Sequence, residues 1–144
     1  MSLFVVDASV AAKWLVQEQF SEQANLLVRL EHRLIAPDLL LLEVASVLTK
    51  KVRRGELTER EARDRKEDTR ERVGLVPSAV LSGDAFELAL RFQRGFYDAL
   101  YLALAINSDC QLVTADRRLV NGLSRTPLAS TALWIEDLPD AQSD

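Results

Sequence analysis

The sequence has very few of the residues that most metal and nucleophile chemistry uses. Its 144 residues include one cysteine, Cys110, and one histidine, His32. An intrachain disulfide needs two cysteines, structural zinc sites usually take four Cys or His ligands, and a zinc-protease helix needs two histidines, so all three are excluded. We interpret His32, in a polar stretch without a nucleophile motif, as solvated, and Cys110 as a buried inert thiol. A metal ion, if one binds, must be held by oxygen.

Long uncharged segments are also missing. The longest one covers residues 73–83, about half of the roughly 20 apolar residues that a membrane span requires. At the N-terminus, Asp7 interrupts the first apolar run before a signal-like segment develops. We therefore expect a protein without a membrane span that stays in the cytoplasm.

The composition is that of a globular protein, with 48% apolar and 28% charged residues. Its length predicts one domain over residues 1–138, followed by a flexible tail at 139–144. The net charge of −4 argues against binding nucleic acid by bulk attraction, but it does not exclude nucleic acid as a substrate. Residues 50–72 hold ten basic and seven acidic side chains. Either these form solvated helices with paired charges, or they make a basic rim over a phosphate-bearing ligand.

Short apolar runs alternate with helical patterns along the chain. Strands are expected at residues 3–6, 34–36, 73–76 and 111–114, with an edge strand at 132–135. Helices are expected at residues 8–17, 21–31, 38–54, 59–71, 83–94, 97–107 and 116–121. Thr58 and Glu61 form a capping box, and Gly55 and Gly95 are expected to end the helices before them. Strands separated by helices predict an α/β fold: a Rossmann-like parallel sheet of four to five strands with helices on both faces.

Four acidic residues occupy unusual positions in this pattern. Asp7 directly follows the first expected strand, and Asp116 follows the fourth by one residue. Ligands of an open parallel sheet bind beyond the carboxyl ends of its strands. Glu43 and Asp98 interrupt strongly apolar helical stretches. Each acid also has a simpler interpretation, as a helix cap, an exposed helix edge or a partner of the helix dipole.

A cluster of four carboxylates needs something to offset its repulsion. At about 5 Å and an effective dielectric of 20, each pair would repel by roughly 3 kcal/mol. Protonation could relieve this, but a hard divalent cation such as Mg²⁺ or Mn²⁺ does so directly and prefers oxygen ligands. Such an ion can activate water and hold a phosphate oxygen, which points to phosphodiester hydrolysis.

Four segments of the chain carry a family resemblance. They are FVVDAS at residues 4–9, LEVA at 42–45, YDALYLALA at 97–105 and LVTADRRL at 112–119. In this order and spacing they resemble the PIN-domain family, and most closely its VapC-type toxins from toxin–antitoxin pairs. The resemblance implies a metal-dependent endoribonuclease, a homodimer and a cognate antitoxin that blocks the site. It places the Mg²⁺ or Mn²⁺ ion among Asp7, Glu43, Asp98 and Asp116.

Several residues near these acids have more than one interpretation. Ser9 and Thr114 match the family's small hydroxyls near the site, although cap or strand-end roles explain them equally well. Many relatives carry Asn at the position of Ser46, so a supporting hydrogen bond from that residue is expected to be shorter or water-mediated. Arg117 and Arg118 could contact RNA phosphates, or they are solvated surface residues.

Other functions are compatible with the same fold class. The protein could be a binding module that keeps the acidic pocket and holds RNA or a protein partner without cutting. A phosphoacceptor domain would need paired acids after the first strand and a suitably placed lysine, which the sequence does not show. An apolar set could line a groove for an antitoxin helix, although such spacing is typical of core. Its members are Trp14, Leu15, Phe20 and Leu27.

Overall fold

The computed structural model describes residues 2–139, and the rest of the expected tail lies outside this range. Its centre is a five-stranded sheet in which every pair of neighbours is parallel, in the order β3-β2-β1-β4-β5. The strands are β1 (Leu3–Val6), β2 (Arg33–Pro37), β3 (Gly74–Val76), β4 (Gln111–Thr114) and β5 (Ala132–Trp134). The expected edge strand is therefore present, and the predicted sheet is confirmed.

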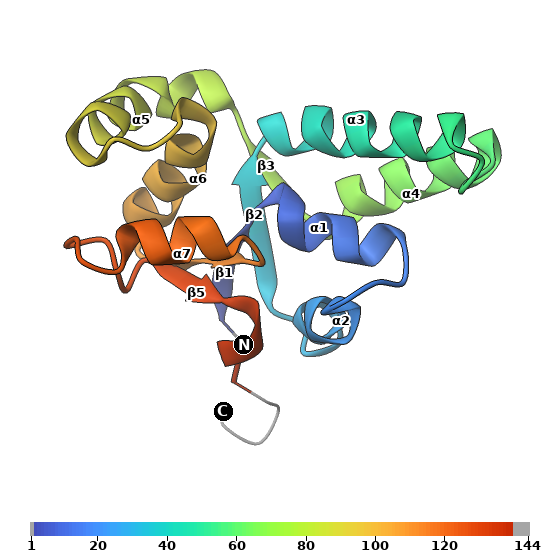
Figure 1. Cartoon of the computed structure of the whole chain (residues 1–144), viewed down its shortest axis with the longest axis horizontal. Coiled ribbons are helices and arrows are strands. Elements are labelled where there is room, and N and C mark those ends of the chain that lie inside the picture. Colours follow the sequence, from blue (N-terminus) through green and yellow to red (C-terminus); the bar gives the residue numbers. More distant parts are fainter. Residues whose placement is uncertain (1, 140–144) are drawn as a thin grey trace.

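Helices cover both faces of this sheet, as expected. They are α1 (Ala8–Leu15), α2 (Ser21–Arg29), α3 (Leu39–Arg53), α4 (Glu59–Arg72), α5 (Ser78–Phe92), α6 (Phe96–Asn107), α7 (Arg117–Leu123) and the 3₁₀ helix η1 (Ile135–Asp137). Figure 1 shows α1 to α4 on one side of the sheet and α5 to α7 on the other. Within residues 2–139, none of these helices has the length and apolar character that a bilayer crossing requires.

The strand order reverses at β1. The chain builds β1, β2 and β3 outward in one direction and then returns to place β4 on the other side of β1. Val6 pairs with Val113, so the residues that follow them lie side by side: Asp7, just after β1, and Thr114, the last residue of β4. This reversal point is where ligands of open α/β sheets bind.

The core is built on the central strands and α6. Val5, Val6, Leu112 and Val113 are fully buried, and α6 is buried continuously over residues 99–105. A helix buried on all sides needs no polar face, which explains why this stretch is so apolar. Because α6 packs against β1, β2 and β4, its position is fixed relative to the sheet.

The prediction for α5 was wrong at both ends. The helix begins at Ser78 rather than Gly83, and it ends at Phe92 rather than Arg94, where its C-cap Gln93 adopts a left-handed conformation with φ 52°. Gly95 does not end this helix; it is the N-cap of α6. An internal glycine costs a helix only about 1 kcal/mol, so Gly83 does not by itself stop α5 from starting earlier.

Several smaller boundaries also differ from the expected ones. α1 ends at Leu15 rather than near Gln17, and α7 continues through Gly122 to Leu123. Pro37 ends β2 instead of opening α3, which begins at Leu39. The capping box of Thr58 and Glu61 is present at the start of α4, as predicted.

The other single residues named from the sequence pack in or against the core, or are half-buried beside it. Leu15 and Leu27 are buried in the core, and Trp14 and Phe20 pack against it, so this set does not form an open groove. His32 is half-buried rather than solvated: its Nδ1 accepts a hydrogen bond from the Ser2 N–H. Cys110 is also only half-buried, and burial raises the pKa of its thiol. None of these residues lies in a cluster suited to catalysis.

Candidate active site

Asp7 is the most strongly held of the four acids. It ends β1, caps α1 and is 9% exposed. Its carboxylate accepts hydrogen bonds from the Ser9 and Thr114 hydroxyls, both at 2.5 Å, and from the Val10 N–H at 3.2 Å. Burial raises the pKa of Asp7 to about 6, against these three hydrogen bonds, which lower it, and with a small upward contribution from the charge of Asp98. The side chain is therefore fixed in orientation and costly to ionise.

The two hydroxyls also connect β1 to β4. Ser9 Oγ accepts a hydrogen bond from the Ala115 N–H at 2.9 Å, and Thr114 Oγ1 accepts one from the Asp116 N–H at 3.0 Å. Each hydroxyl thus donates to Asp7 and accepts from the backbone that follows β4. The expected positions of Ser9 and Thr114 beside the acids are observed, and the link keeps Asp7 and Asp116 at a fixed separation.

Asp116 and Asp98 approach this network from two helices. Asp116 caps α7, where its Oδ1 accepts a hydrogen bond from the Arg118 N–H at 3.0 Å. Asp98 lies in the first turn of α6. Partial desolvation and then the negative charge of Asp116 raise the pKa of Asp98, while the positive charge of Arg94 lowers it. Asp98 is therefore close enough to repel both Asp7 and Asp116.

Glu43 reaches the same region through a tyrosine. The Tyr101 hydroxyl donates a hydrogen bond to Glu43 Oε1 at 2.5 Å, across the interface between α6 and α3. Tyr101 is only 4% exposed. Burial and then the Glu43 carboxylate raise the pKa of Tyr101, and the charges of Asp7 and Asp98 add to this rise. Tyr101 thus contacts Glu43 and lies near the charges of Asp7 and Asp98.

Tyr101 was not among the residues selected from the sequence. It belongs to the most apolar helix, and its ring alone explains its place in the core. The available signal is its spacing, because Tyr101 follows Asp98 by three residues and so lies on the same side of α6. A hydroxyl on that side, one turn deeper than an acid, has to find a polar partner.

The donor set fits a hard divalent cation in its chemistry. Asp7 and Asp116 follow the carboxyl ends of β1 and β4, and all four acids offer only oxygen, which is what Mg²⁺ and Mn²⁺ prefer. Their spacing is open: across residues 2–139, no three Asp, Glu, His or Cys side chains stand close enough together to hold one ion. The structure therefore gathers the predicted acids in one region without closing them into a ligand set.

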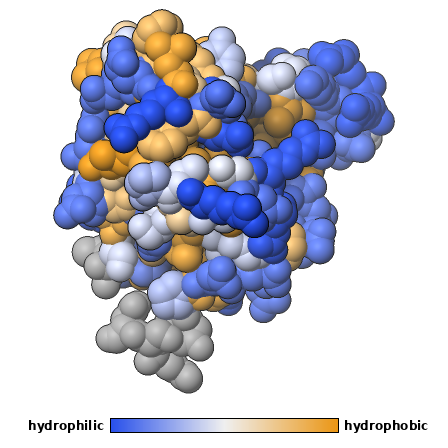
Figure 2. Space-filling model, turned by 60° about the vertical axis from the view of Figure 1, so that its left-hand side comes forward, coloured by the Kyte–Doolittle hydropathy of each residue, from blue (hydrophilic) through white to orange (hydrophobic). Residues whose placement is uncertain are grey.

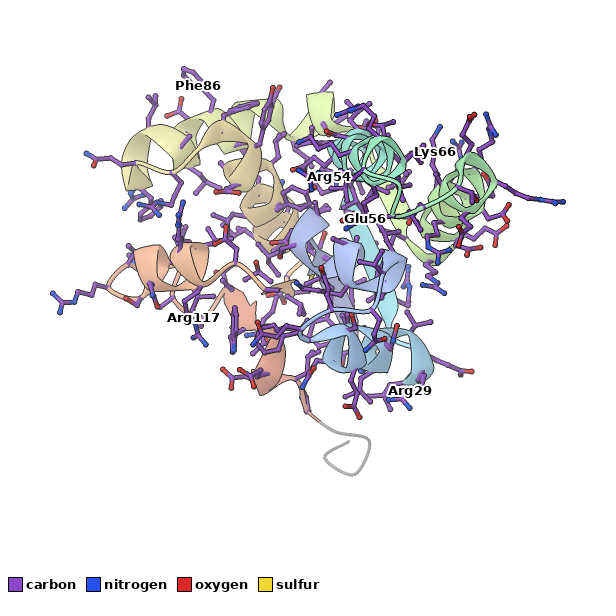
Figure 3. The ribbon with its side chains drawn as sticks, turned by 45° about the vertical axis from the view of Figure 1, so that its right-hand side comes forward. Arg29, Arg54, Glu56, Lys66, Phe86 and Arg117 are labelled. Atoms are coloured by element: carbon purple, nitrogen blue, oxygen red, sulfur yellow. The ribbon has the colours of Figure 1, made fainter. Side chains whose placement is uncertain are left out.

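Within residues 2–139, the side chains of three other predicted residues make no hydrogen bond or ion pair with the four acids, and Arg118 contacts Asp116 only through its backbone N–H. Ser46 is exposed, and within residues 2–139 its hydroxyl makes no hydrogen bond, while its carbonyl accepts one from the Thr49 hydroxyl. Arg117, labelled in Figure 3, places its guanidinium 3.8 Å from the centre of the Trp134 ring. Arg118 is exposed on α7. The supporting role of Ser46 and the RNA contacts of both arginines remain predictions.

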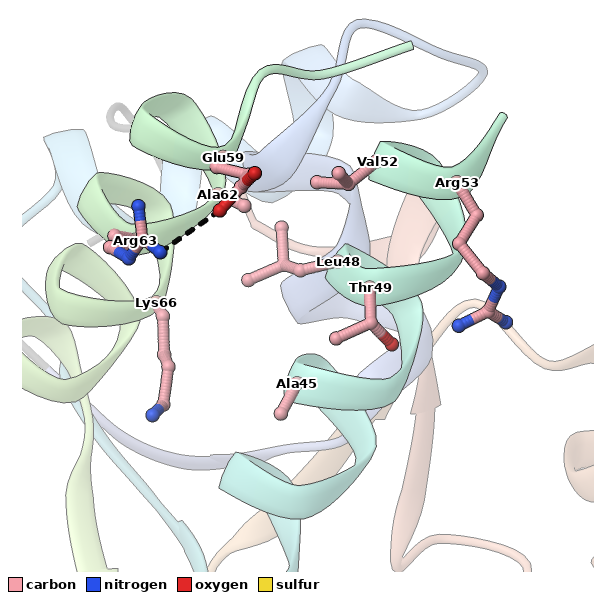
Figure 4. A pocket seen from close by; sticks show the side chains of 9 residues that line it. All are labelled: Ala45, Leu48, Thr49, Val52, Arg53, Glu59, Ala62, Arg63 and Lys66. Atoms are coloured by element: carbon pink, nitrogen blue, oxygen red, sulfur yellow. Dashed lines mark hydrogen bonds and ion pairs between the residues drawn. The ribbon is translucent and has the colours of Figure 1, made fainter. Parts of the chain in front are cut away.

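A separate hollow of about 440 Å³ lies between α3 and α4. Figure 4 shows Leu48, Val52 and Ala62 pointing into it, with the Glu59–Arg63 ion pair at its edge. None of the four acids lines this hollow. The neighbouring charges form ion pairs, including Lys51 with Glu56 and Arg65 with Glu61. This pairing favours the solvated-helix interpretation of residues 50–72.

Known proteins share both the sequence pattern and the fold. The PIN domain profile matches residues 4–122. Ribonuclease VapC3 from Pyrobaculum aerophilum is 42% identical over 118 residues, which cover 80% of this chain and 90% of that protein. The crystal structure of PAE2754 from Pyrobaculum aerophilum has a TM-score of 0.69 at 22% identity, covering 94% of this chain and 93% of that one. The structure of VapBC2 from Rickettsia felis, bound to a DNA fragment from their promoter, has a TM-score of 0.67 at 14% identity and covers 92% and 98%.

These likenesses extend over most of the chain, and the two structures share its fold. Nucleases of the matched family normally use a divalent metal ion. The sequence segments that resembled this family contain the four acids that the fold brings to one edge of the sheet. The chain belongs to the PIN-domain family.

Proposed function

We propose that this protein is an endoribonuclease that hydrolyses RNA phosphodiester bonds, acting in the cytoplasm as the toxin of a toxin–antitoxin pair. The observation that carries the proposal is the gathering of Asp7, Glu43, Asp98 and Asp116 where the strand order reverses. The 42% identity to a protein named Ribonuclease VapC3 supports the choice of RNA.

The four acids would hold Mg²⁺ or Mn²⁺. When bound, the ion supplies an activated water and a ligand position for a phosphate oxygen. Ser9 and Thr114 keep the Asp7 carboxylate in one orientation, and Tyr101 does the same for Glu43. Groups that orient metal ligands in this way typically change metal affinity or activity by about 10- to 100-fold when removed.

The state of Asp7 sets the pH range of activity. Its pKa of about 6 means that the carboxylate is mostly ionised only above this pH. An ionised carboxylate is the form that binds a cation, and a bound cation displaces the proton, so we expect cleavage to rise with pH and the midpoint of this rise to fall as the metal concentration increases.

Cleavage of an end-labelled structured RNA under single-turnover conditions tests the proposal. We expect fragments with Mg²⁺ or Mn²⁺, none with EDTA, and none from the Asp98→Asn variant. Asp64→Asn, an exposed residue of α4, is the matched control and should cut normally. Cleavage in EDTA or by Asp98→Asn would contradict the proposal. An RNA that is shifted but never shortened would instead identify a binding module.

The hollow between α3 and α4 is suited to the proposed antitoxin. Its floor is apolar, and Arg53, Arg63 and Lys66 line its edge. An amphipathic helix with acidic flanks complements such a surface. We expect co-expression with the antitoxin to relieve growth inhibition, and Lys66→Glu, a charge reversal at the exposed edge of this hollow, to prevent the relief. Relief that survives Lys66→Glu would place the antitoxin elsewhere.

An apolar face over α5 is the place for the proposed homodimer contact. Val80, Phe86 and Leu90 of α5 are 76%, 55% and 63% exposed, and Tyr97 of α6 is 64% exposed. Figure 2 shows apolar side chains gathered across the top of the molecule, where α5 lies in Figure 1. Phe86 points outward from the helix in Figure 3. Contiguous apolar surface of this kind is typical of protein interfaces.

A further inference from the structure

Arg94 is held in the short turn between α5 and α6. Its backbone N–H donates to the Ala89 carbonyl at 3.2 Å, and its Nε donates to the Phe92 carbonyl at 3.3 Å. The next residue, Gly95, is the N-cap of the helix that carries Asp98. The end of α5 therefore fixes both the backbone of Arg94 and the near side of its guanidinium.

The far side of this guanidinium rests on Gly122 of α7. A Cβ atom at residue 122 would lie 2.1 Å from Nη1, 2.9 Å from Cζ and 3.4 Å from Nη2 of Arg94. The guanidinium thus fills the space that any other residue would need for its side chain. Glycine inside a helix is unfavourable by about 1 kcal/mol relative to alanine, so its presence calls for a packing reason. Seating Arg94 supplies that reason.

The Arg94 guanidinium keeps hydrogen-bonding capacity. In the part of the chain that the structure describes, no carboxylate lies within 4 Å of it, and neither Nη atom has a hydrogen-bond acceptor. It is nevertheless near the acids: Arg94 adjoins Gly95, where a Cβ atom would lie 3.9 Å from Asp98 Oδ2, and the charge of Arg94 lowers the pKa of Asp98. A planar guanidinium with two free nitrogens matches a phosphate group in bidentate geometry.

A polyanion that approaches four carboxylates needs a fixed positive charge beside them. Arg117 is stacked on Trp134, and Arg118 is exposed on α7. Arg94 differs from both because two backbone acceptors and a glycine seat hold it at the edge of the acids.

We propose that Arg94 binds a backbone phosphate of the RNA at the edge of the acidic site, and that Gly122 is the seat that aims its guanidinium. This inference rests on the proposed ribonuclease function. It assigns Arg94 to substrate binding and Gly122 to positioning.

RNA affinity measured across a salt series, in an Asp7→Asn background that prevents cleavage, tests the inference. We expect Arg94→Ala to weaken binding about tenfold, the size of one hydrogen-bonded charge contact, and to reduce the salt slope by about one. Arg94→Lys keeps the charge but not the planar fork, and should recover binding only in part. Arg29→Ala is the control, because Arg29 is exposed on α2, far from α7 in Figure 3.

A double-mutant cycle tests whether Gly122 positions the Arg94 guanidinium. Gly122→Ala alone should weaken RNA binding as Arg94→Ala does, because the new methyl group displaces the guanidinium. In the Arg94→Ala background the same change should cause no further loss of binding and should raise the melting temperature, since only the helix preference remains. Equal losses from Gly122→Ala in both backgrounds would overturn the role of Gly122.

The remaining outcomes are also decisive. If Arg94→Ala tightens metal binding but leaves RNA affinity and the salt slope unchanged, Arg94 only neutralises Asp98 and the inference is wrong. If the unmodified protein cuts no RNA yet binds it through Arg94, the proposed activity fails while the phosphate contact stands. If the protein cuts RNA and Arg94→Ala binds and cuts normally, the inference alone fails.

Discussion

At the scale of single residues, the site holds a buried acid, Asp7, whose carboxylate is oriented by hydrogen-bond donors around it. Asp7 is desolvated by the core below it, yet three hydrogen bonds keep its carboxylate in place. A carboxylate in this position is costly for the folded protein when no cation is present. The acid therefore serves function at the expense of stability.

This cost predicts a pH dependence of stability. The pKa of Asp7 is about 6 in the folded protein and 3.8 for the ordinary side chain. Between these values the folded state binds more protons than the unfolded state, so the free energy of unfolding falls as the pH rises. The loss is complete above about pH 6 and amounts to about 3 kcal/mol.

We expect Asp7→Asn to remove this loss. In EDTA, the variant should melt at a higher temperature than the unmodified protein at pH 7 to 8, and the difference should shrink toward pH 4. Asp64→Asn, on the surface of α4, should show no such pH-dependent difference. A melting difference that is the same at pH 4 and pH 8 would contradict the assignment.

Tyr101 gives a second prediction at this scale. Tyr101→Phe removes the hydroxyl that donates to Glu43, so Glu43 loses its fixed orientation. We expect the Mg²⁺ concentration for half-maximal cleavage to rise about tenfold, with partial recovery at saturating metal. Tyr97→Phe, on the exposed start of α6, is the matched control. An unchanged metal requirement in Tyr101→Phe would show that Glu43 needs no such support.

At the scale of elements, the starts of α3 and α5 cap each other. The Asp38 carboxylate accepts hydrogen bonds from the N–H and the hydroxyl of Ser78, at 3.0 and 2.7 Å. In return, Ser78 Oγ accepts a hydrogen bond from the Leu39 N–H at 3.0 Å. The two bonds from Ser78 also hold the pKa of Asp38 below its usual range. This exchange fixes the start of α5 at a point that no glycine marks.

Removing the hydrogen bonds between Asp38 and Ser78 tests how much they contribute to stability. Ser78→Ala should lower the free energy of unfolding by about 1 kcal/mol, as the loss of a helix cap does, and the melting temperature by about 3 °C. Ser82→Ala is the control, since its hydroxyl bonds only to the Ala79 carbonyl of its own helix. Equal effects of the two substitutions would show that the link between the helices adds nothing.

At the scale of the whole molecule, the apolar face over α5 predicts self-association. Phe86→Glu places a charge in the middle of this face and should reduce the mass measured by sedimentation from dimer to monomer. Desolvating an unpaired carboxylate in an interface costs several kcal/mol, and a loss of this size should dissociate the dimer. Asn25→Glu, on the exposed surface of α2, should leave the mass unchanged. A Phe86→Glu protein that remains dimeric would place the contact on another surface.

The sequence alone determined the strands, the parallel class of the sheet and the edge at which the acids meet. These features depend on local patterns: apolar runs for buried strands, caps for helix starts, and acids directly after strands. Asp7, Asp116, Ser9 and Thr114 were predictable because they lie within a few residues of a strand end.

Only the tertiary structure decided what Tyr101, Ser78 and Arg94 contact. Tyr101 meets Glu43 across 58 positions of sequence, and Ser78 meets Asp38 across 40. Arg94 rests on a glycine of another helix. Such contacts arise from packing between separate elements, and no local periodicity encodes which side chain will be opposite. Local patterns therefore fixed where the acids gather, while packing between helices decided how they are held.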